Sequence, residues 1–180
     1  MIIETNSAKE TFELGKRLGE KAVAGQIYTL NGDLGTGKTV FTQGVAVGLG
    51  IKEPVNSPTF TIVQEYEGGR LPFYHFDVYR IGDIEEMEEI GYDDYFFGKG
   101  ICLIEWAELI EELLPESIIA ITIEKNPEKG FDYRKITIDG LATFLIQKID
   151  RAAMPLYLLH FLSQKISFYR ENTCPYDLIL

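Results

Sequence analysis

Hydrophobic positions along the first 50 residues follow two different periods. Ser7-Ala8-Lys9-Glu10 has the form of a helix capping box, and the apolar stripe that follows it at helical spacing ends near Gly25. Gln26 to Leu30 is a short apolar run, which is typical of a buried strand. After a glycine-rich loop, a second helix is predicted from about Gly37 to Leu49. This alternation of helix and buried strand predicts the beginning of an α/β fold.

The middle of the chain predicts a hairpin followed by an acidic helix. Residues 59–66 have a strand-like pattern, and Gly68-Gly69 separates them from a returning strand at 71–80. Residues 83–89 are strongly acidic, and we expect them to be helical.

The third part of the chain adds three more strands. Ile101 to Ile104 is a continuous apolar run, as in a strand that is buried on both faces. A helix is predicted from 107 to 114, ended by Pro115, and two late strands are predicted at 117–124 and 133–139. Because helices alternate with only some of the strands, the sequence predicts an α/β fold of the P-loop NTPase type, with a mixed sheet flanked by helices.

The pattern divides the chain into two parts. Residues 1–140 form one predicted domain, and residues 141–180 form a C-terminal extension in which apolar pieces at 141–149 and 156–162 favour two short helices. This extension could cover the sheet, meet a partner or be partly disordered, and the sequence does not choose among these.

Composition narrows the function classes. The 180 residues are 46% hydrophobic and 25% charged, the profile of a soluble globular protein, and the net charge is −11. Lys and Arg drive binding to nucleic-acid phosphates, so we expect a partner to supply the basic surface for any contact with RNA. The two cysteines, Cys102 and Cys174, form no C-x-x-C pair, which argues against a disulfide scaffold or a zinc site. The chain shows no apolar run of about 18 residues and no basic, signal-like start, so no membrane contact and a cytoplasmic location are expected.

The glycine-rich loop matches the phosphate-binding pattern G-x-x-x-x-G-K-[ST]. Its glycines bring backbone N–H groups close to a phosphate, Lys38 reaches the β- and γ-phosphates, and the Thr39 hydroxyl binds Mg²⁺. At roughly 7% glycine per position, such a match arises by chance in about 1% of chains or fewer. The residues predicted to contact the nucleotide in and after the loop are Gly32, Asp33, Leu34, Gly35, Thr36, Gly37, Lys38, Thr39 and Val40.

The sequence favours ATP over GTP. Guanine recognition in GTPases typically depends on an N-K-x-D segment, and the nearest candidate here, residues 126–129, does not fit. No D-x-x-G segment follows the loop at a suitable distance either. We therefore expect ATP and Mg²⁺ to bind.

Two carboxylates are candidates for the chemistry. Asp77 lies in an apolar strand, where a charge is costly unless it is paired or bound to a metal, and its alternative role is an ion pair with Arg80 or another cation. Glu105 ends a buried strand, at the sheet edge where ligands bind in α/β folds, and it could polarise an attacking water. Its alternative is an ordinary charged residue that leaves a strand. The candidate metal ligands are Thr39, Asp77 and Glu105, and the candidate catalytic residues are Lys38 and Glu105.

Residues around these acids have weaker assignments. In the segment 57–61, Thr59 or Thr61 could sense Mg²⁺ and the γ-phosphate, and capping of a strand is an equal alternative. Core packing is the favoured role for Trp106, the only tryptophan. We expect that neither of the two histidines, His75 and His160, has a metal-ligand neighbour and that both have structural roles.

The chain resembles the TsaE (YjeE) family of small bacterial P-loop ATPases in four motifs, in their order and in their spacing. The motifs are G-D-L-G-T-G-K-T, S-P-T-F-T-I-V, H-F-D-V-Y-R-I and L-I-E-W-A-E. The resemblance covers about residues 5 to 140. It implies an ATPase that supports threonylcarbamoyladenosine formation in tRNA within a complex of TsaB and TsaD and meets tRNA only indirectly. It also implies that Lys38 and Thr39 bind phosphate and Mg²⁺, Asp77 is the acid on the Mg²⁺ side, Glu105 is the catalytic acid and Thr59 is a switch residue.

Two other functions fit the same loop. A small-molecule kinase needs a lid with several arginines, whereas this chain has only six arginines and no Arg-rich segment. A regulatory module that binds nucleotide without useful hydrolysis would not need both Asp77 and Glu105. The acidic residues between 83 and 94 are either a solvated helix face or a docking surface for a basic partner.

Overall fold

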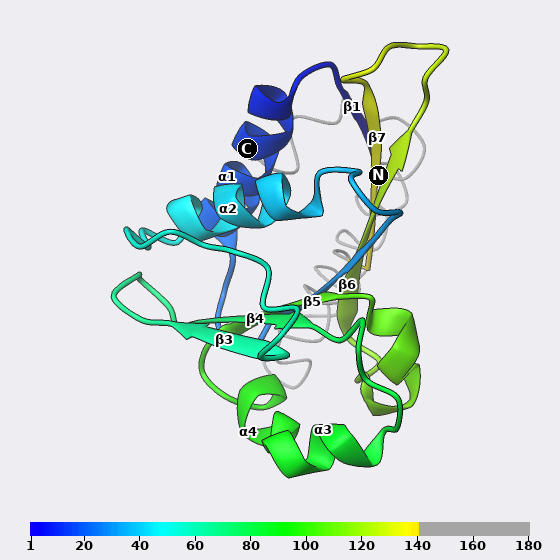
Figure 1. Ribbon diagram of the computed structural model, residues 1–180. Coiled ribbons are helices and arrows are strands. Elements are labelled where there is room, and N and C mark those ends of the chain that lie inside the picture. The colour runs from blue at the N-terminus through cyan, green and yellow to red at the C-terminus, as the bar shows by residue number, and fades with distance from the viewer. Residues whose placement is uncertain (141–180) are drawn as a thin grey trace, which may run out of the picture.

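The computed structural model of the protein describes residues 1–140 (Figure 1). One seven-stranded sheet has the order β1-β7-β6-β2-β5-β4-β3. The predicted extension at 141–180 lies outside the described residues, so its structure stays a prediction. The strands are β1 (Ile2–Thr5), β2 (Ile27–Asn31), β3 (Val63–Tyr66), β4 (Phe73–Asp77), β5 (Ile101–Glu105), β6 (Ile118–Lys125) and β7 (Arg134–Asp139). The helices are α1 (Ala8–Lys21), α2 (Lys38–Gly48), α3 (Glu85–Ile90), α4 (Tyr92–Phe96) and the 3-10 helix η1 (Ala107–Leu113).

The sheet is mixed, as the sequence predicts. Strands β4, β5, β2 and β6 run parallel, whereas β1 pairs antiparallel with β7, β7 with β6, and β3 with β4. The register aligns Leu30 with Glu105 and Glu105 with Asp77. The carboxyl ends of three neighbouring strands therefore meet at one edge of the sheet, and the predicted α/β fold is confirmed.

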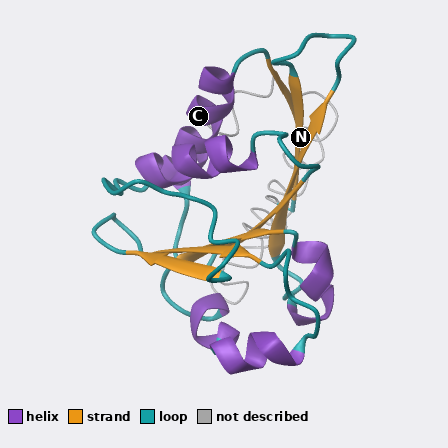
Figure 2. Cartoon of the chain, viewed as in Figure 1, coloured by secondary structure: helices purple, strands orange, loops and turns teal. Residues whose placement is uncertain are grey.

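Helices cover both faces of the sheet (Figure 2). One apolar cluster joins α1 and α2 to the sheet, and a second joins the other face to α3, α4 and η1. Strand β5 contributes to both, because Ile101 and Leu103 belong to the first cluster while Cys102 and Ile104 belong to the second. This arrangement explains why the strand is apolar at successive positions.

Close packing of α1 on α2 fixes the helix that follows the glycine-rich loop. The predicted capping box is present, since Glu10 N donates to Ser7 Oγ at 3.2 Å, but the helix ends at Lys21, before the predicted end near Gly25. A Cβ atom at Gly15 would lie 2.2 Å from the Phe41 carbonyl oxygen. No other residue type allows this approach, so α2 is held against α1 through backbone contact.

The predicted hairpin is shorter than expected. Strand β3 begins at Val63 and not at residue 59, because the amides of Thr61 and Ile62 both donate to Pro58 O, at 3.0 and 2.8 Å. Strand β4 ends at Asp77 and not at residue 80, since Ile81 N donates back to Val78 O at 3.0 Å. A turn therefore precedes β3, and another turn follows β4.

Three elements differ from the sequence expectation in other ways. Strand β1 was not predicted, because four residues show too little alternation to be recognised before β7 is placed beside them. The acidic helix is α3, and a second short helix, α4, follows a turn at Gly91. The helix predicted at 107–114 is the 3-10 helix η1, with a non-helical Ile110. Within residues 1–140, no helix has the length and apolar character needed to cross a membrane.

Candidate functional site

The glycine-rich loop joins β2 to α2 and has backbone geometry that requires glycine. Gly32 has φ +146°, and a Cβ atom there would lie 2.4 Å from the Ile123 carbonyl oxygen. Gly37, at the start of α2, has φ +102°. Positive φ at these positions lets the loop curl so that its N–H groups and the helix N-terminus form an anion site. The loop can therefore accept a phosphate group.

Lys38 lies in the first turn of α2 and is buried. Its Nζ donates to Gly32 O at 2.6 Å and to Asp33 O at 3.3 Å, and it lies 4.3 Å from the centroid of the Trp106 ring. The ammonium group therefore sits between the loop and the segment that follows β5. Trp106 packs half-buried against the second apolar cluster as well, so core packing is only part of its role.

Two cations on the neighbouring strands hold the loop from β6 and β7. Lys125 Nζ donates to Leu34 O at 3.0 Å, and Arg134 Nε donates to Thr36 O at 2.7 Å. Both contacts fix the direction of loop carbonyl groups. Sequence reasoning missed both residues, since only the strand order reveals that β6 and β7 lie beside the loop.

Asp77 is buried at the end of β4, where hydroxyl groups surround it. Its Oδ2 accepts hydrogen bonds from Ser57 Oγ and Thr59 Oγ1, both at 2.6 Å. The alternative ion pair with Arg80 is wrong for this structure: in residues 1–140 Asp77 pairs with no cation, and the Arg80 guanidinium lies 4.7 Å from the centroid of the Phe60 ring. Of the two switch candidates, the structure brings Thr59 to Asp77.

Glu105 ends β5 and contacts a histidine. Its Oε1 lies 3.0 Å from His75 Nε2, and both side chains are buried. The expectation that His75 has no neighbour among the candidate metal ligands is therefore wrong. Strand alternation was the sequence signal that could have placed His75 near the candidate metal ligands, because it puts His75 and Asp77 on the same face of β4.

Three oxygen-bearing side chains, those of Asp77, Glu105 and Thr39, are the candidate Mg²⁺ ligands at this end of the sheet and the start of α2. Asp77 and Glu105 are register partners on adjacent parallel strands, which lie about 4.8 Å apart. Thr39 is in the first turn of α2, and its hydroxyl makes no hydrogen bond to the described residues. Hydroxyl and carboxylate oxygens are the ligands that Mg²⁺ prefers, and Mg²⁺ at phosphate sites takes only one or two protein carboxylates. This donor set fits Mg²⁺, although residues 1–140 contain no cluster of three or more His, Cys, Asp or Glu.

Unusual backbone conformations flank both acids. In the described part of the chain, only two residues other than glycine have positive φ: Ile62, at +65°, and Trp106, at +62°. Ile62 accepts a hydrogen bond from Asp77 N at 2.8 Å, and Trp106 directly follows Glu105. Such conformations cost about 1–3 kcal/mol each and cluster at functional sites. They support the carboxyl edge of β4 and β5 as the candidate functional part of the sheet.

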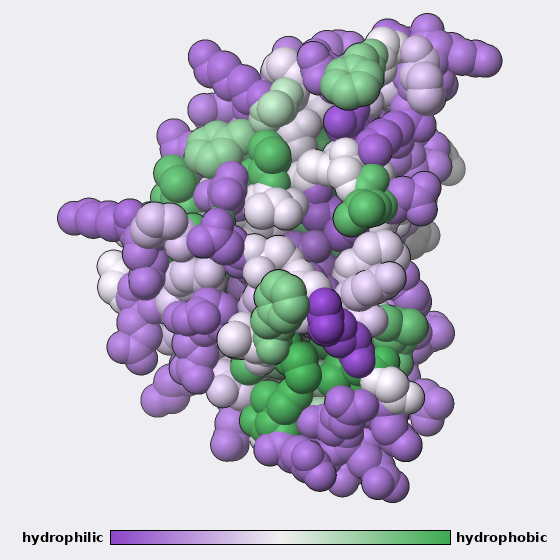
Figure 3. Space-filling model, viewed as in Figure 1, coloured by the Kyte–Doolittle hydropathy of each residue, from purple (hydrophilic) through white to green (hydrophobic). Residues whose placement is uncertain are grey.

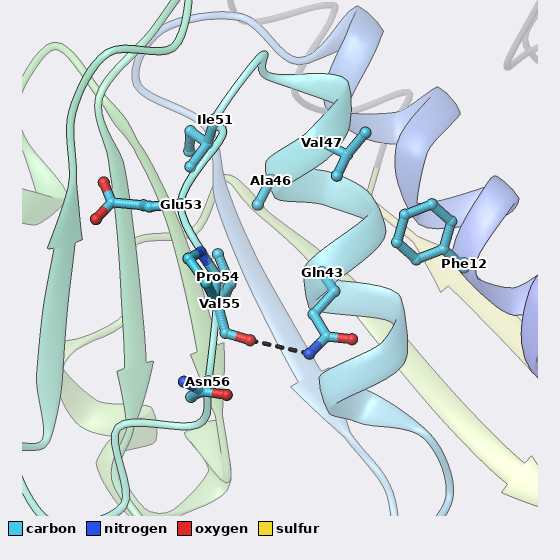
Figure 4. Close-up of a pocket in the computed structure, with 9 residues that line it drawn as sticks. All are labelled: Phe12, Gln43, Ala46, Val47, Ile51, Glu53, Pro54, Val55 and Asn56. Carbon is cyan, nitrogen blue, oxygen red and sulfur yellow. Dashed lines mark hydrogen bonds between the residues drawn. The ribbon is translucent and has the colours of Figure 1, made fainter.

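A surface hollow of about 220 Å³ lies between α2 and the segment that leads to Ser57 (Figure 4). A hydrogen bond joins its two sides, because Gln43 Nε2 on α2 donates to Val55 O at 2.9 Å. None of its lining residues belongs to the glycine-rich loop or carries a candidate acid. The lining residues are Phe12, Gln43, Ala46, Val47, Ile51, Glu53, Pro54, Val55 and Asn56.

Comparisons with known proteins agree with this architecture. The sequence model of the family described as "Threonylcarbamoyl adenosine biosynthesis protein TsaE" matches residues 5–136. A Bacillus subtilis protein named tRNA threonylcarbamoyladenosine biosynthesis protein TsaE is 52% identical over 137 residues, which cover 76% of this chain and 84% of that protein. A Treponema pallidum protein of the same name is 41% identical over 119 residues, which cover 66% of this chain and 87% of its own.

A solved structure is similar over nearly the whole chain. The crystal structure of Bacillus subtilis YdiB aligns with a TM-score of 0.69 and 39% identity, over 92% of this chain and 95% of that one. The family match includes the loop, Asp77 and Glu105, so it spans every element of the site described above. The chain therefore belongs to the TsaE family.

Proposed function

We propose that this protein is a Mg²⁺-dependent ATPase subunit that supports threonylcarbamoyladenosine modification of tRNA through a complex with TsaB and TsaD. The observation that carries the ATPase part is the position of Glu105, a buried carboxylate at the sheet edge that is the register partner of Asp77 and directly precedes Trp106, whose ring contacts Lys38. The names of the relatives, which refer to threonylcarbamoyladenosine biosynthesis, support the role in tRNA modification.

Each residue of the site has a distinct role in this proposal. The loop N–H groups and Lys38 bind the phosphates of ATP, and Thr39 and Asp77 hold Mg²⁺. Bound Mg²⁺ neutralises negative charge on the β- and γ-phosphates. Glu105 orients the attacking water and accepts its proton, and Thr59 responds to the γ-phosphate through its hydrogen bond to Asp77.

The arginines give little support to the kinase alternative. A kinase that closes over a transferred phosphoryl group needs free guanidinium groups near the loop. Arg70 donates to the carbonyl groups of Gly19 and Ala22, and Arg134 donates to Thr36 O. In residues 1–140, this leaves Arg17 on α1 and Arg80 as the remaining guanidinium groups, and two are too few to form a lid.

ATP hydrolysis by the purified chain, measured alone and with TsaB and TsaD, tests the proposal. We expect slow hydrolysis alone and faster hydrolysis in the complex. Phosphate transfer to a small molecule would favour the kinase, and ATP binding without hydrolysis in either condition would favour a regulatory module.

The acidic surface supports contact with tRNA through partners. Seven carboxylates lie on or beside α3 and α4, and all are exposed. None of them pairs with a cation within the described part of the chain. Apolar side chains also interrupt the hydrophilic surface on the face drawn in Figure 3, and Phe60 and Leu34 are 85% and 87% exposed. The seven acids are Asp83, Glu85, Glu86, Glu88, Glu89, Asp93 and Asp94.

Charge reversal on α3 should weaken the complex and leave ATP affinity unchanged. The change is Glu85, Glu86, Glu88 and Glu89 to Lys, and the measurement is the Kd for TsaB and TsaD at several salt concentrations. Wild-type binding should weaken as salt rises, because charges are screened beyond about 10 Å at 0.1 M salt. The reversed chain should bind weakly and lose most of this salt dependence.

A matched control separates local from global charge. Glu53, Glu67, Glu116 and Glu128 are also exposed, and reversing these four changes the net charge equally. This control should bind the partners better than the α3 variant does. Equal loss in both variants, or tight and salt-insensitive binding of tRNA by the isolated chain, would contradict a docking role for α3.

A further inference from the structure

We propose that His75 is a positioning residue for Glu105: its Nε2–H group donates to one carboxylate oxygen and aims the other at the phosphate loop. The inference deepens the proposed function and rests on it for the role of Glu105. Within residues 1–140, the His75 side chain makes a hydrogen bond to Glu105 and to no residue of the loop or other candidate metal ligand. It therefore acts through Glu105 and is not itself catalytic.

The first support is burial of a polar ring where the fold needs none. His75 is 0% exposed. It lies on the same face of β4 as Phe73, and the centroids of the two rings are 6.0 Å apart. An apolar residue would satisfy the packing there. Burial of a polar group is costly without a hydrogen bond, so the imidazole is explained by its contact with Glu105.

The second support is the hydrogen-bond inventory of the imidazole. Nε2 lies 3.0 Å from Glu105 Oε1, whereas Nδ1 is buried without a partner within residues 1–140. A carboxylate oxygen only accepts, so Nε2 must carry the proton. A neutral ring then leaves Nδ1 as a bare lone pair, which is the least costly group to leave unpaired in this position. The structure assigns the Nε2–H tautomer to His75.

The third support is the asymmetry of the Glu105 carboxylate. Oε1 contacts His75. Oε2 makes no hydrogen bond to the described residues, and it is not completely shielded from solvent. One oxygen is thus fixed and the other stays accessible. A base needs this arrangement, because its free oxygen must accept a proton from water in a fixed direction.

The tautomer can be tested without nucleotide. The chain has two histidines, so the variant His160→Gln leaves His75 as the single imidazole in a ¹⁵N-labelled sample. The spectrum should show a protonated Nε2, an unprotonated Nδ1 and a downfield Nε2 proton. Adding Glu105→Gln, which keeps an oxygen but removes the charge, should move that proton upfield. A protonated Nδ1 in the otherwise wild-type site, or an Nε2 signal that ignores Glu105→Gln, would overturn the inference.

A pair of amide substitutions tests the consequence for hydrolysis. The amide nitrogen of Gln is as many bonds from Cα as Nε2 of His, whereas that of Asn is one bond shorter. His75→Gln can therefore keep the contact with Glu105, and His75→Asn cannot. Loss of a hydrogen bond to a charged group changes an equilibrium or rate constant by about ten- to hundredfold, so His75→Asn should lower kcat by about that factor. ATP affinity, followed by the fluorescence of Trp106, should stay the same.

Rescue and non-additivity separate positioning from stability. His75→Gln should retain most of the wild-type kcat, and His75→Asn should cost nothing further in the Glu105→Gln background, since it acts only through that carboxylate. Equal loss of kcat in both amide variants, with equal loss of thermal stability, would show a structural role and overturn the inference. If the wild type hydrolyses no ATP alone or with partners, the proposed function fails, and the imidazole spectrum still decides whether His75 holds Glu105.

Discussion

Glu105→Gln should bind ATP and Mg²⁺ as the wild type does and lose nearly all hydrolysis. Glutamine keeps the size of the side chain and an oxygen atom for the contact with His75 Nε2. It cannot accept a proton from water, and it lacks the charge that orients that water. General-base groups contribute about 10²- to 10⁴-fold to rate, so kcat should fall by about that factor.

The measurement is single-turnover hydrolysis at saturating ATP, together with a binding titration on the same sample. Glu108→Gln is the matched control, because Glu108 is an exposed carboxylate on η1, close to Glu105 in the sequence. The control should hydrolyse ATP at the wild-type rate. Wild-type turnover by Glu105→Gln would remove Glu105 from the catalytic role, and loss of ATP binding would indicate that its charge belongs to the binding site.

Local patterns predicted the loop and the two acids. The spacing of glycines with Lys38 and Thr39 is a property of consecutive residues, so it is visible without the fold. Asp77 could be found because a carboxylate inside an apolar strand is costly unless it is paired or bound to a metal, and Glu105 could be found because it ends a buried strand at the edge where ligands bind. The family match over residues 5–136 includes the loop and both acids, whose roles stay predictions.

Contacts across the sheet could not be predicted from the chain alone. Arg134 reaches Thr36 O only because β6 lies beside β2 and β7 lies beside β6, an order that no local pattern specifies. The bond between His75 and Glu105 likewise depends on the register of β4 against β5. The early end of β4 depends on a turn at Val78, and β-propensity alone extends that strand through Tyr79.

The hydroxyl contacts around Asp77 also come from tertiary structure. The residues alone left Thr59 and Thr61 as alternatives for a switch residue, and the family resemblance implied Thr59. The turn closed by Pro58 O favours Thr59, because it exposes Thr61 and leaves Thr59 Oγ1 at 2.6 Å from Asp77 Oδ2. A loop that shares hydrogen bonds with a candidate metal ligand can respond when that ligand changes partners.

Lys38→Ala should remove most ATP affinity. In this structure the Lys38 ammonium group is buried and lies against the loop carbonyl of Gly32, at 2.6 Å, and against the Trp106 ring. A charge-assisted contact is worth roughly 1.5–3 kcal/mol, so its loss should raise the Kd for ATP about ten- to hundredfold. Calorimetry is the suitable measurement, because the substitution changes the surroundings of Trp106 and would alter its fluorescence directly.

Two controls make the Lys38 result specific to the phosphate site. Lys52→Ala removes an exposed lysine near the end of α2 and should leave the Kd unchanged. Thermal unfolding of Lys38→Ala checks that the loop remains folded, since the carbonyl groups of Gly32 and Asp33 lose their donor. Because Lys38 reaches the β- and γ-phosphates in this proposal, the loss of affinity should be larger for ATP than for AMP. A folded Lys38→Ala protein with wild-type ATP affinity would refute the assignment of this loop as the phosphate site.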